Sequence, residues 1–495
     1  MLEGENMIND KPLKSPSRKL RCCMTALLPS FLLPAIHGTP STTAKISPTA
    51  WLDGMRGWAA FFVFLRHFEF AYFRKGAFVY GTIEDPNYPN ANRHLLQLPI
   101  LRLINAGEAM VCIFFVVSGY ALSLKSLKLI RQSSHGQLLH ALASSIFRRP
   151  FRLFLPCIAS TAIIFICLRI GVFDYPNLIA EDEATFRYVF WGWAHEPQPH
   201  VFATFQEQFW NYCEATKGLL NIMTHEHWPS HGYDIHLWTI PVEFRCSMVL
   251  FLTIAGLAMV RTRVRLITVA ALVVCSFQFD VFELGLFWGG MLLAELNLIR
   301  EEKASANEWV DEEMSAFRIK SKRQEEENSD TIWYCLFILS LLLLSFPPEK
   351  AQFAPIYSTL LEWSPSGLRP SERHRFWTSI GAMLLIWSTN NNETLQKPFS
   401  CALGRYLGNI SYALYLMHGL VNRTLGYSTV FNVWENITGK ETPAQYQTGV
   451  VLGGLVVVPA TIWVADLFWR YVDLPMVRFA RSIENKVLAP MNGES

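Results

Sequence analysis

The sequence predicts an all-α, polytopic membrane protein with about ten transmembrane helices. The chain has 495 residues, of which 51% are hydrophobic and only 17% are charged. Soluble domains average about 25% charged residues, so this composition favours a chain that lies largely within lipid. The formal net charge of +2 indicates no nucleic-acid partner, and membrane lipid is the expected surrounding.

Repeated apolar segments predict the individual helices, because runs of this length suit the hydrocarbon core of a bilayer. The segments cover residues 51–73, 109–124, 151–173, 236–260, 264–281, 282–298, 331–348, 376–390, 406–424 and 449–471. Residues 264–298 fit either two short helices joined near Asp280 or one re-entrant hairpin, and the sequence leaves both open.

The polar segments predict the domain organisation. The predicted parts are a disordered or interfacial cytosolic tail over residues 1–48, a multispanning domain over 49–480 and a C-terminal tail over 481–495. A cytosolic N-terminus satisfies the positive-inside rule, because the basic residues around Arg148 then face the cytosol. On this topology, residues 174–235 form a luminal loop and residues 300–330 a charged cytosolic linker.

The first apolar segment carries ionisable residues, Arg56 and His67. They are 11 residues apart, which in a helix is about three turns and about 16 Å, so both side chains share one helix face. A charged residue at membrane depth costs roughly 2.5–3.5 kcal/mol on insertion scales, so it usually faces a partner, a cavity or a substrate path. One helix is therefore expected to offer a cation near its entrance and a proton acceptor deeper in.

Five separated segments resemble the type 3 membrane acyltransferases, multispanning enzymes that O-acylate sugars, cell-wall polymers, antibiotics and other secondary metabolites. They are WLDGMRGWAAFFVFLRHF at 51–68, IFFVVSGYALS at 113–123, FRRPFRLFLP at 147–156, LWTIPVEF at 237–244 and LGNISYALYLMHG at 407–419. The sequence departs from the family pattern at Cys112, Pro241 and Asp473, where Asp, Ser and Glu are common. The resemblance covers roughly residues 50 to 480.

This resemblance implies an acyl-CoA donor, an acceptor hydroxyl and a catalytic histidine in the first span. His67 is then the candidate general base, because an alcohol must lose its proton as it attacks a thioester and imidazole titrates near neutral pH. An acyl-histidine intermediate is an alternative that the sequence leaves open. Without the family pattern, His67 would be interpreted as a buried, hydrogen-bonded neutral histidine.

Four arginines are candidates for binding the donor. Guanidinium groups bind phosphate through two parallel hydrogen bonds, so Arg56 is expected to meet the anionic donor. Arg148, Arg149 and Arg152 would extend this site to the diphosphate and 3′-phosphate of coenzyme A. The alternative is that they anchor a helix end at the cytosolic surface. Acyl-CoA, with acetyl-CoA preferred, is expected as a substrate, and no permanently bound cofactor is predicted.

Two further intramembrane residues are candidates for the site. Glu243 is a second catalytic candidate, which would orient His67 or hold the acceptor, because a buried carboxylate needs such a partner. Its structural alternative is an ion pair with Arg245 or Arg66. His418 is a candidate substrate contact, and a packed, hydrogen-bonded histidine is the alternative.

No metal site is predicted. The nearest candidates are His225, His227, His231 and His236. Their spacing on a probable loop lacks the cysteines or paired carboxylates that support zinc.

The residues and the resemblance together predict an integral membrane O-acyltransferase. It would move an acetyl or short acyl group from coenzyme A to a hydroxyl of a small acceptor, such as a secondary metabolite. The expected location is the endoplasmic reticulum or another endomembrane, with the plasma membrane as the alternative. Two other functions remain open: a sugar or cell-wall O-acetyltransferase, and a secondary transporter that uses Arg56, His67 and Glu243 as an intramembrane site.

Overall fold

The chain divides into two compact units, Met1–Ile46 and Ser47–Ser495. The computed structural model describes residues 25–33, 47–73, 78–82, 92–180, 183–190, 196–223, 232–311 and 317–487, with the side chains of 183, 187, 188, 306–311, 317–329 and 371 excluded. Most of the predicted N-terminal tail and the end of the predicted C-terminal tail therefore lie outside the described residues. The candidate site belongs to the second unit.

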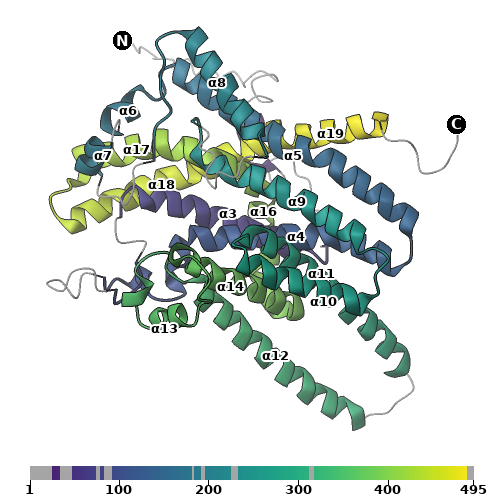
Figure 1. Ribbon diagram of the computed structural model, residues 1–495. Coiled ribbons are helices and arrows are strands. Elements are labelled where there is room, and N and C mark those ends of the chain that lie inside the picture. Colours follow the sequence, from purple (N-terminus) through teal and green to yellow (C-terminus); the bar gives the residue numbers. More distant parts are fainter. Residues whose placement is uncertain are drawn as a thin grey trace, which may run out of the picture. The chain divides into compact units, whose positions relative to one another are not determined.

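All the regular structure in the described residues is helical, as predicted. Helices form at each of the predicted spans: α3 (Ala50–Phe70), α4 (Gly107–Arg131), α5 (His135–Arg169), α9 (Thr239–Gly256), α10 (Thr262–Gln278), α11 (Phe282–Asp311), α12 (Phe317–Leu344), α14 (Arg373–Asn391), α16 (Ala402–Val421) and α18 (Pro443–Phe468) (Figure 1). The connecting segments carry shorter helices: α6 (Asp174–Ala180), α7 (Glu183–Val189), α8 (Phe205–Leu220), α13 (Tyr357–Glu362), α15 (Glu393–Ser400), α17 (Tyr427–Val433) and α19 (Leu474–Val487).

Within the described residues, 5 helical segments are long and apolar enough to cross a membrane. They are Gly107–Arg131, His135–Arg169, Ile235–Gly256, Phe282–Ser305 and Pro443–Val487. The structure thus supports a membrane protein, but it does not confirm the count of about ten spans. The remaining predicted spans are short or interrupted by charged and polar residues; α3, for example, contains Asp53, Arg56, Arg66 and Glu69.

The 264–298 region forms two helices, α10 and α11, that meet near Asp280. This arrangement fits both of the alternatives, so the choice between them stays a prediction. Asp280 lies in the turn between them with a φ of 60°, in the left-handed region. The predicted linker over 300–330 is largely helical, because α11 and α12 extend into it.

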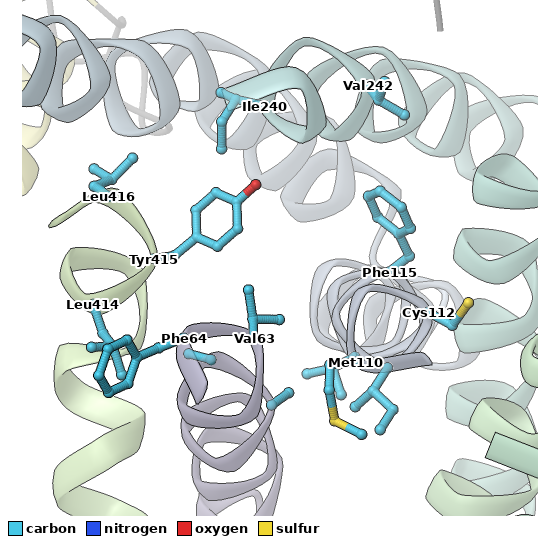
Figure 2. Close-up of a cluster of buried hydrophobic side chains, with 14 of the residues drawn as sticks. Val63, Phe64, Met110, Cys112, Phe115, Ile240, Val242, Leu414, Tyr415 and Leu416 are labelled. Carbon is cyan, nitrogen blue, oxygen red and sulfur yellow. The ribbon is translucent and has the colours of Figure 1, made fainter. Parts of the chain in front are cut away.

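Helices α3 and α16 pack with their backbones almost in contact. A Cβ added at Gly57 of α3 would lie 2.3 Å from the backbone nitrogen of Gly408 in α16, so only glycine permits this approach. Figure 2 shows the core beyond this crossing, where Val63 of α3 and Tyr415 of α16 point toward side chains of α4 and α9. This packing fixes the relative positions of the C-terminal ends of α3 and α16, which carry His67 and His418.

Candidate active site

His67 lies near the C-terminal end of α3 and contacts a carboxylate from a distant loop. Its Nδ1 atom is 2.7 Å from Oε1 of Glu196, which lies in the segment before α8. The Glu196 side chain is almost fully buried. Burial alone would raise the pKa of this carboxyl, but the imidazoles of His236 and His67 outweigh it and hold the pKa well below its ordinary value. Glu196 is therefore a carboxylate that accepts hydrogen bonds.

A second histidine, His236, joins this pair just before α9. Its Nε2 atom lies 3.3 Å from Oε1 of Glu196 and 3.1 Å from Nδ1 of His67. Its Nδ1 atom lies 2.7 Å from Oδ1 of Asp234, which is also buried. Burial would raise the pKa of Asp234, but His236 opposes it most strongly and keeps that pKa below its ordinary value. His236 thus lies between two carboxylates.

Helix α16 holds this arrangement from the other side. The hydroxyl of Tyr415 donates to the backbone carbonyl of His236 and lies 2.7 Å from Oγ1 of Thr239. A Cβ added at Gly419 would lie 2.7 Å from Nδ1 of His236, so the absence of a side chain here leaves room for the imidazole.

His418 of α16 lies against both other imidazoles, with ring centroids 5.2 Å from His67 and 4.5 Å from His236. It is fully buried, and its Nδ1 lies 2.7 Å from the Tyr415 carbonyl oxygen, which accepts the hydrogen bond. Its Nε2 atom has no hydrogen-bond partner among the described residues. The structure therefore brings His418 to His67, while its predicted contact with substrate stays a prediction.

The three imidazoles have the spacing of a possible metal site, since one ligand atom from each lies within 4.8 Å of the others. In the present geometry, Glu196 and Asp234 already provide partners for His67 and His236. The predicted absence of a metal remains a prediction. Of the histidines considered for zinc in the sequence, His236 belongs to this cluster, while His225, His227 and His231 lie outside the described residues.

A cavity of about 330 Å³ opens beside His67. Its wall is mostly apolar and includes Val63, Phe70, Val111, Cys112, Phe115, Trp238 and Leu286. Its polar lining has two sets of side chains. The first is the His67 cluster, with Glu196, His236, Thr239 and Tyr415; the second is a charged set, Arg66, Glu108, Glu283 and Arg375. The second set is held by ion pairs, among them Glu108 with His374 and Arg375 with Glu283.

Glu243 does not contact His67. Its Oε1 atom accepts hydrogen bonds from a guanidinium NH2 of Arg149 at 2.7 Å and from the hydroxyl of Ser118 at 3.2 Å. Neither ion-pair partner considered in the sequence, Arg245 or Arg66, appears in these contacts. Glu243 therefore contacts one of the arginine candidates, Arg149. The carboxylate beside His67, a position considered for Glu243 in the sequence, belongs to Glu196.

The predicted donor-binding arginines lie together toward the other end of α3. Arg148, Arg149 and Arg152 line a small cleft of about 100 Å³, to which α19 adds Arg481. Arg148 pairs with Glu484 at 3.0 Å, and Arg56 lies 3.7 Å from Asp53. Arg152 is exposed and forms no direct ion pair with any residue that the structure describes, although the Asp473 carboxylate lies near enough to interact with it.

The arginines and the His67 cavity lie toward opposite ends of the same helices. The cavity includes Gly107 and Glu108, the first two residues of the candidate span α4. Leu122, further along α4, lines the arginine cleft. On the topology predicted from the positive-inside rule, the cavity therefore faces the lumen and the arginines face the cytosol.

Comparisons with known proteins identify the family of this chain. An acyltransferase 3 family model, described as an acyltransferase domain, matches residues 49–470. The chain is 30% identical to the O-acetyltransferase PaAT-1 of Phomopsis amygdali, over 97% of this chain and 95% of that protein. It is 25% identical to the acyltransferase clz18 of Cochliobolus lunatus, over 88% and 95%. It is 24% identical to the acyltransferase R4 of Phoma sp. (strain ATCC 20986 / MF5453), over 87% and 94%.

No solved structure matches this chain. The family model covers most of the chain, including the helices that carry His67, His236 and His418. The chain therefore belongs to the acyltransferase 3 family.

Proposed function

We propose that this protein moves an acetyl or short acyl group from acyl-CoA to the hydroxyl of a small acceptor within the membrane. The observation that carries the proposal is the position of His67, which contacts a buried carboxylate and lines a cavity whose wall area is mostly apolar. An imidazole in this position is suited to take the proton of a bound alcohol. Family membership favours an acyltransferase over the transporter that the sequence left open.

The chemistry follows from a base beside an acceptor hydroxyl. His67 accepts the proton of the hydroxyl as its oxygen attacks the carbonyl carbon of the thioester. The carbon–sulfur bond of the tetrahedral intermediate then breaks, and the leaving thiolate takes the proton from His67. The products are the ester and free coenzyme A. A positioned base of this kind typically contributes about 10²–10⁴-fold in rate.

The arginines support a phosphate-bearing donor. Arg152 is exposed, and Arg148 is partly exposed, so both can meet a soluble anion. Arg149 is held in place by Glu243 and by the Ser247 hydroxyl at 3.0 Å. From Arg56 to His67 the helix rises by about 16 Å, a separation that the extended pantetheine arm of coenzyme A could bridge.

The cavity supports a small and largely apolar acceptor. Most of the wall area is apolar, which favours an acceptor with a large apolar surface, while side chains such as His67, Thr239 and Tyr415 offer a few polar contacts. A cavity of about 330 Å³ also suits a single small molecule better than a polymer. A hydroxylated apolar metabolite therefore fits better than a sugar or cell-wall chain. The relative named an O-acetyltransferase supports acetyl as the group transferred.

We propose the endoplasmic reticulum or another endomembrane as the location; the apolar helices and the positive-inside pattern support an integral membrane protein. Tagged full-length protein followed by fluorescence microscopy and membrane fractionation would test this. Recovery of the protein in the plasma-membrane fraction alone would contradict it.

The function can be tested with purified full-length protein in detergent and acetyl-CoA. We expect free thiol to be released only when an apolar alcohol is present, and the acetyl ester to appear in equal amount. A panel that pairs hydroxylated terpenoid and aromatic alcohols with monosaccharides would test the acceptor class. Thiol release with none of the alcohols, together with alcohol uptake into proteoliposomes, would instead support a transporter.

A further inference from the structure

We propose that Glu196 is a positioning residue for His67, and that Glu196, His236 and Asp234 together determine which nitrogen of His67 faces the acceptor. This inference rests on the proposed acyl transfer. It assigns a role to a loop residue that lies in none of the segments carrying the family resemblance.

The contact with Glu196 determines which ring nitrogen of His67 carries the proton. Its Nδ1 atom lies 2.7 Å from a carboxylate oxygen of Glu196, which can only accept a hydrogen bond when ionised. This contact is shorter than the 3.1 Å between the same Nδ1 and Nε2 of His236, so it favours the tautomer of the neutral imidazole with the proton on Nδ1. The lone pair is left on Nε2, and this atom forms no hydrogen bond with the described part of the protein. Nε2 is thus the atom that can take a proton from a bound alcohol.

The loop that carries Glu196 is held in place by hydrogen bonds from Arg423. Arg423, which follows α16 and is fully buried, donates to the carbonyl of Pro197 at 3.2 Å and to the carbonyl of Tyr233 at 2.8 Å. It also donates to the carbonyl of Gly419 at 3.2 Å. One guanidinium therefore fastens the residue after Glu196, the residue before Asp234 and helix α16 to one another.

The charges of Asp234, His236 and Glu196 interact with one another. His236 has one ring nitrogen near each carboxylate, so as an imidazolium it donates to both Asp234 and Glu196. This places a positive ring between two negative groups and keeps Glu196 ionised. One carboxylate oxygen then accepts from both His236 and His67.

The proton balance of the reaction follows. When Nε2 of His67 takes the acceptor's proton, the imidazolium keeps its Nδ1–H bond to Glu196, now as an ion pair. The proton later leaves from Nε2 to the thiolate of coenzyme A, and Glu196 itself is never protonated. The groups facing the His67 ring during this cycle are Glu196, His236, His418 and, from its own helix, Arg66.

The test is Glu196→Gln in the full-length protein, with acetyl-CoA and the alcohol that supports thiol release. A glutamine can also donate through its amide, so it no longer fixes the Nδ1–H tautomer. We expect kcat to fall by about 10²- to 10⁴-fold, with the KM for the alcohol within about threefold of wild type. Glu196→Asp, which keeps the carboxylate, should recover part of the rate.

A second readout does not depend on turnover. Diethyl pyrocarbonate modifies neutral imidazole, and peptide mass spectrometry can follow the modification of His67 as a function of pH. Loss of the anionic neighbour should let the ring stay neutral at lower pH, so the midpoint of modification should move down by about one pH unit or more. A purely structural role for Glu196 would not produce this shift.

Glu214→Gln is the matched control, because Glu214 lies on α8, is exposed and pairs only weakly with Lys217 at 3.4 Å. It should leave both kcat and the pH midpoint unchanged. If Glu196→Gln does not fold, Asp234→Asn carries the test: releasing His236 from one carboxylate should lower kcat about tenfold. Wild-type kcat in the folded Glu196→Gln variant, or in Asp234→Asn where that variant replaces it, overturns the proposal.

Failure of this inference can be told apart from failure of the proposed function by one further variant. Inactive His67→Ala with fully active Glu196→Gln would overturn only the role of Glu196. Wild-type turnover by His67→Ala would overturn the acyl-transfer mechanism itself.

Discussion

The two ends of α3 differ in how deeply the neighbouring charged side chains are buried and in how they are paired. At the C-terminal end, His67 lies among buried groups that contact one another, with Glu196, Asp234 and His236 each at most 6% exposed. Toward the N-terminal end, the Arg56 and Arg148 side chains are 28% and 36% exposed. Each guanidinium contacts one carboxylate, that of Asp53 and that of Glu484, through one of its nitrogens. A buried charge must find its partners within the protein, whereas a site for a soluble anion must keep donors free. The difference indicates a preorganised chemical end and an open binding end.

A large effect is expected at Gly419, where a methyl group would contact His236 at the C-terminal end of α3 and leave the arginines untouched. Gly419→Ala places a Cβ within 2.7 Å of Nδ1 of His236, whose ring is already held by Asp234. Because small misplacements in a preorganised site can cost about 10²-fold, we expect kcat to fall by about that factor. Binding of acyl-CoA, measured by isothermal titration calorimetry, should stay within about twofold of wild type.

Gly218→Ala is the control for this variant, since a Cβ at that helical glycine would meet no atom within 4 Å. It should leave kcat unchanged. Equal activity of Gly419→Ala and Gly218→Ala would show that the position of His236 does not matter for the chemistry.

A smaller effect is expected at the binding end. Arg152→Gln removes an exposed guanidinium with no described ion-pair partner, so the folded protein should lose little stability. If Arg152 meets a phosphate of the donor, the KM for acetyl-CoA should rise about tenfold, equivalent to about 1.4 kcal/mol, with kcat unchanged. Steady-state kinetics at two salt concentrations would check this.

Lys217→Gln removes an exposed cation of α8, which the predicted topology places on the luminal side. It should not change the KM for acetyl-CoA. A fall in kcat alone for Arg152→Gln would contradict the assignment of this residue to donor binding.

The smallest effect is expected for Glu243, and it separates two interpretations of that residue. Because its carboxylate contacts Arg149 and Ser118, Glu243→Gln should loosen Arg149 and raise the KM for acetyl-CoA by about threefold to fivefold. A catalytic partner of His67 would instead show a large loss of kcat at unchanged KM. Parallel measurement of both constants distinguishes the two.

The sequence predicted the parts of this arrangement that depend on local pattern. The spacing of Arg56 and His67 predicted that one helix carries both, and α3 does. Clustered basic residues in one helix predicted that Arg148, Arg149 and Arg152 lie together, and they line one cleft. Such patterns repeat within a few helical turns, so they can be recognised without knowing the fold.

The partners that arise from tertiary packing could not be predicted in this way. Glu196 is 129 residues from His67 and lies in a loop with no motif, so no sequence signal connects the two. Glu243 was the better candidate by its place in an apolar segment, yet packing gives it to Arg149, 94 residues away. His236 immediately precedes the LWTIPVEF segment, and that proximity was a signal that could have joined it to the site.

The most direct test of the account measures transfer and donor binding together in His67→Ala. The account predicts that this variant inserts normally into membranes and binds acetyl-CoA with wild-type affinity, while acetyl transfer to the alcohol falls by about 10²-fold or more. Transfer at the wild-type rate would contradict the account.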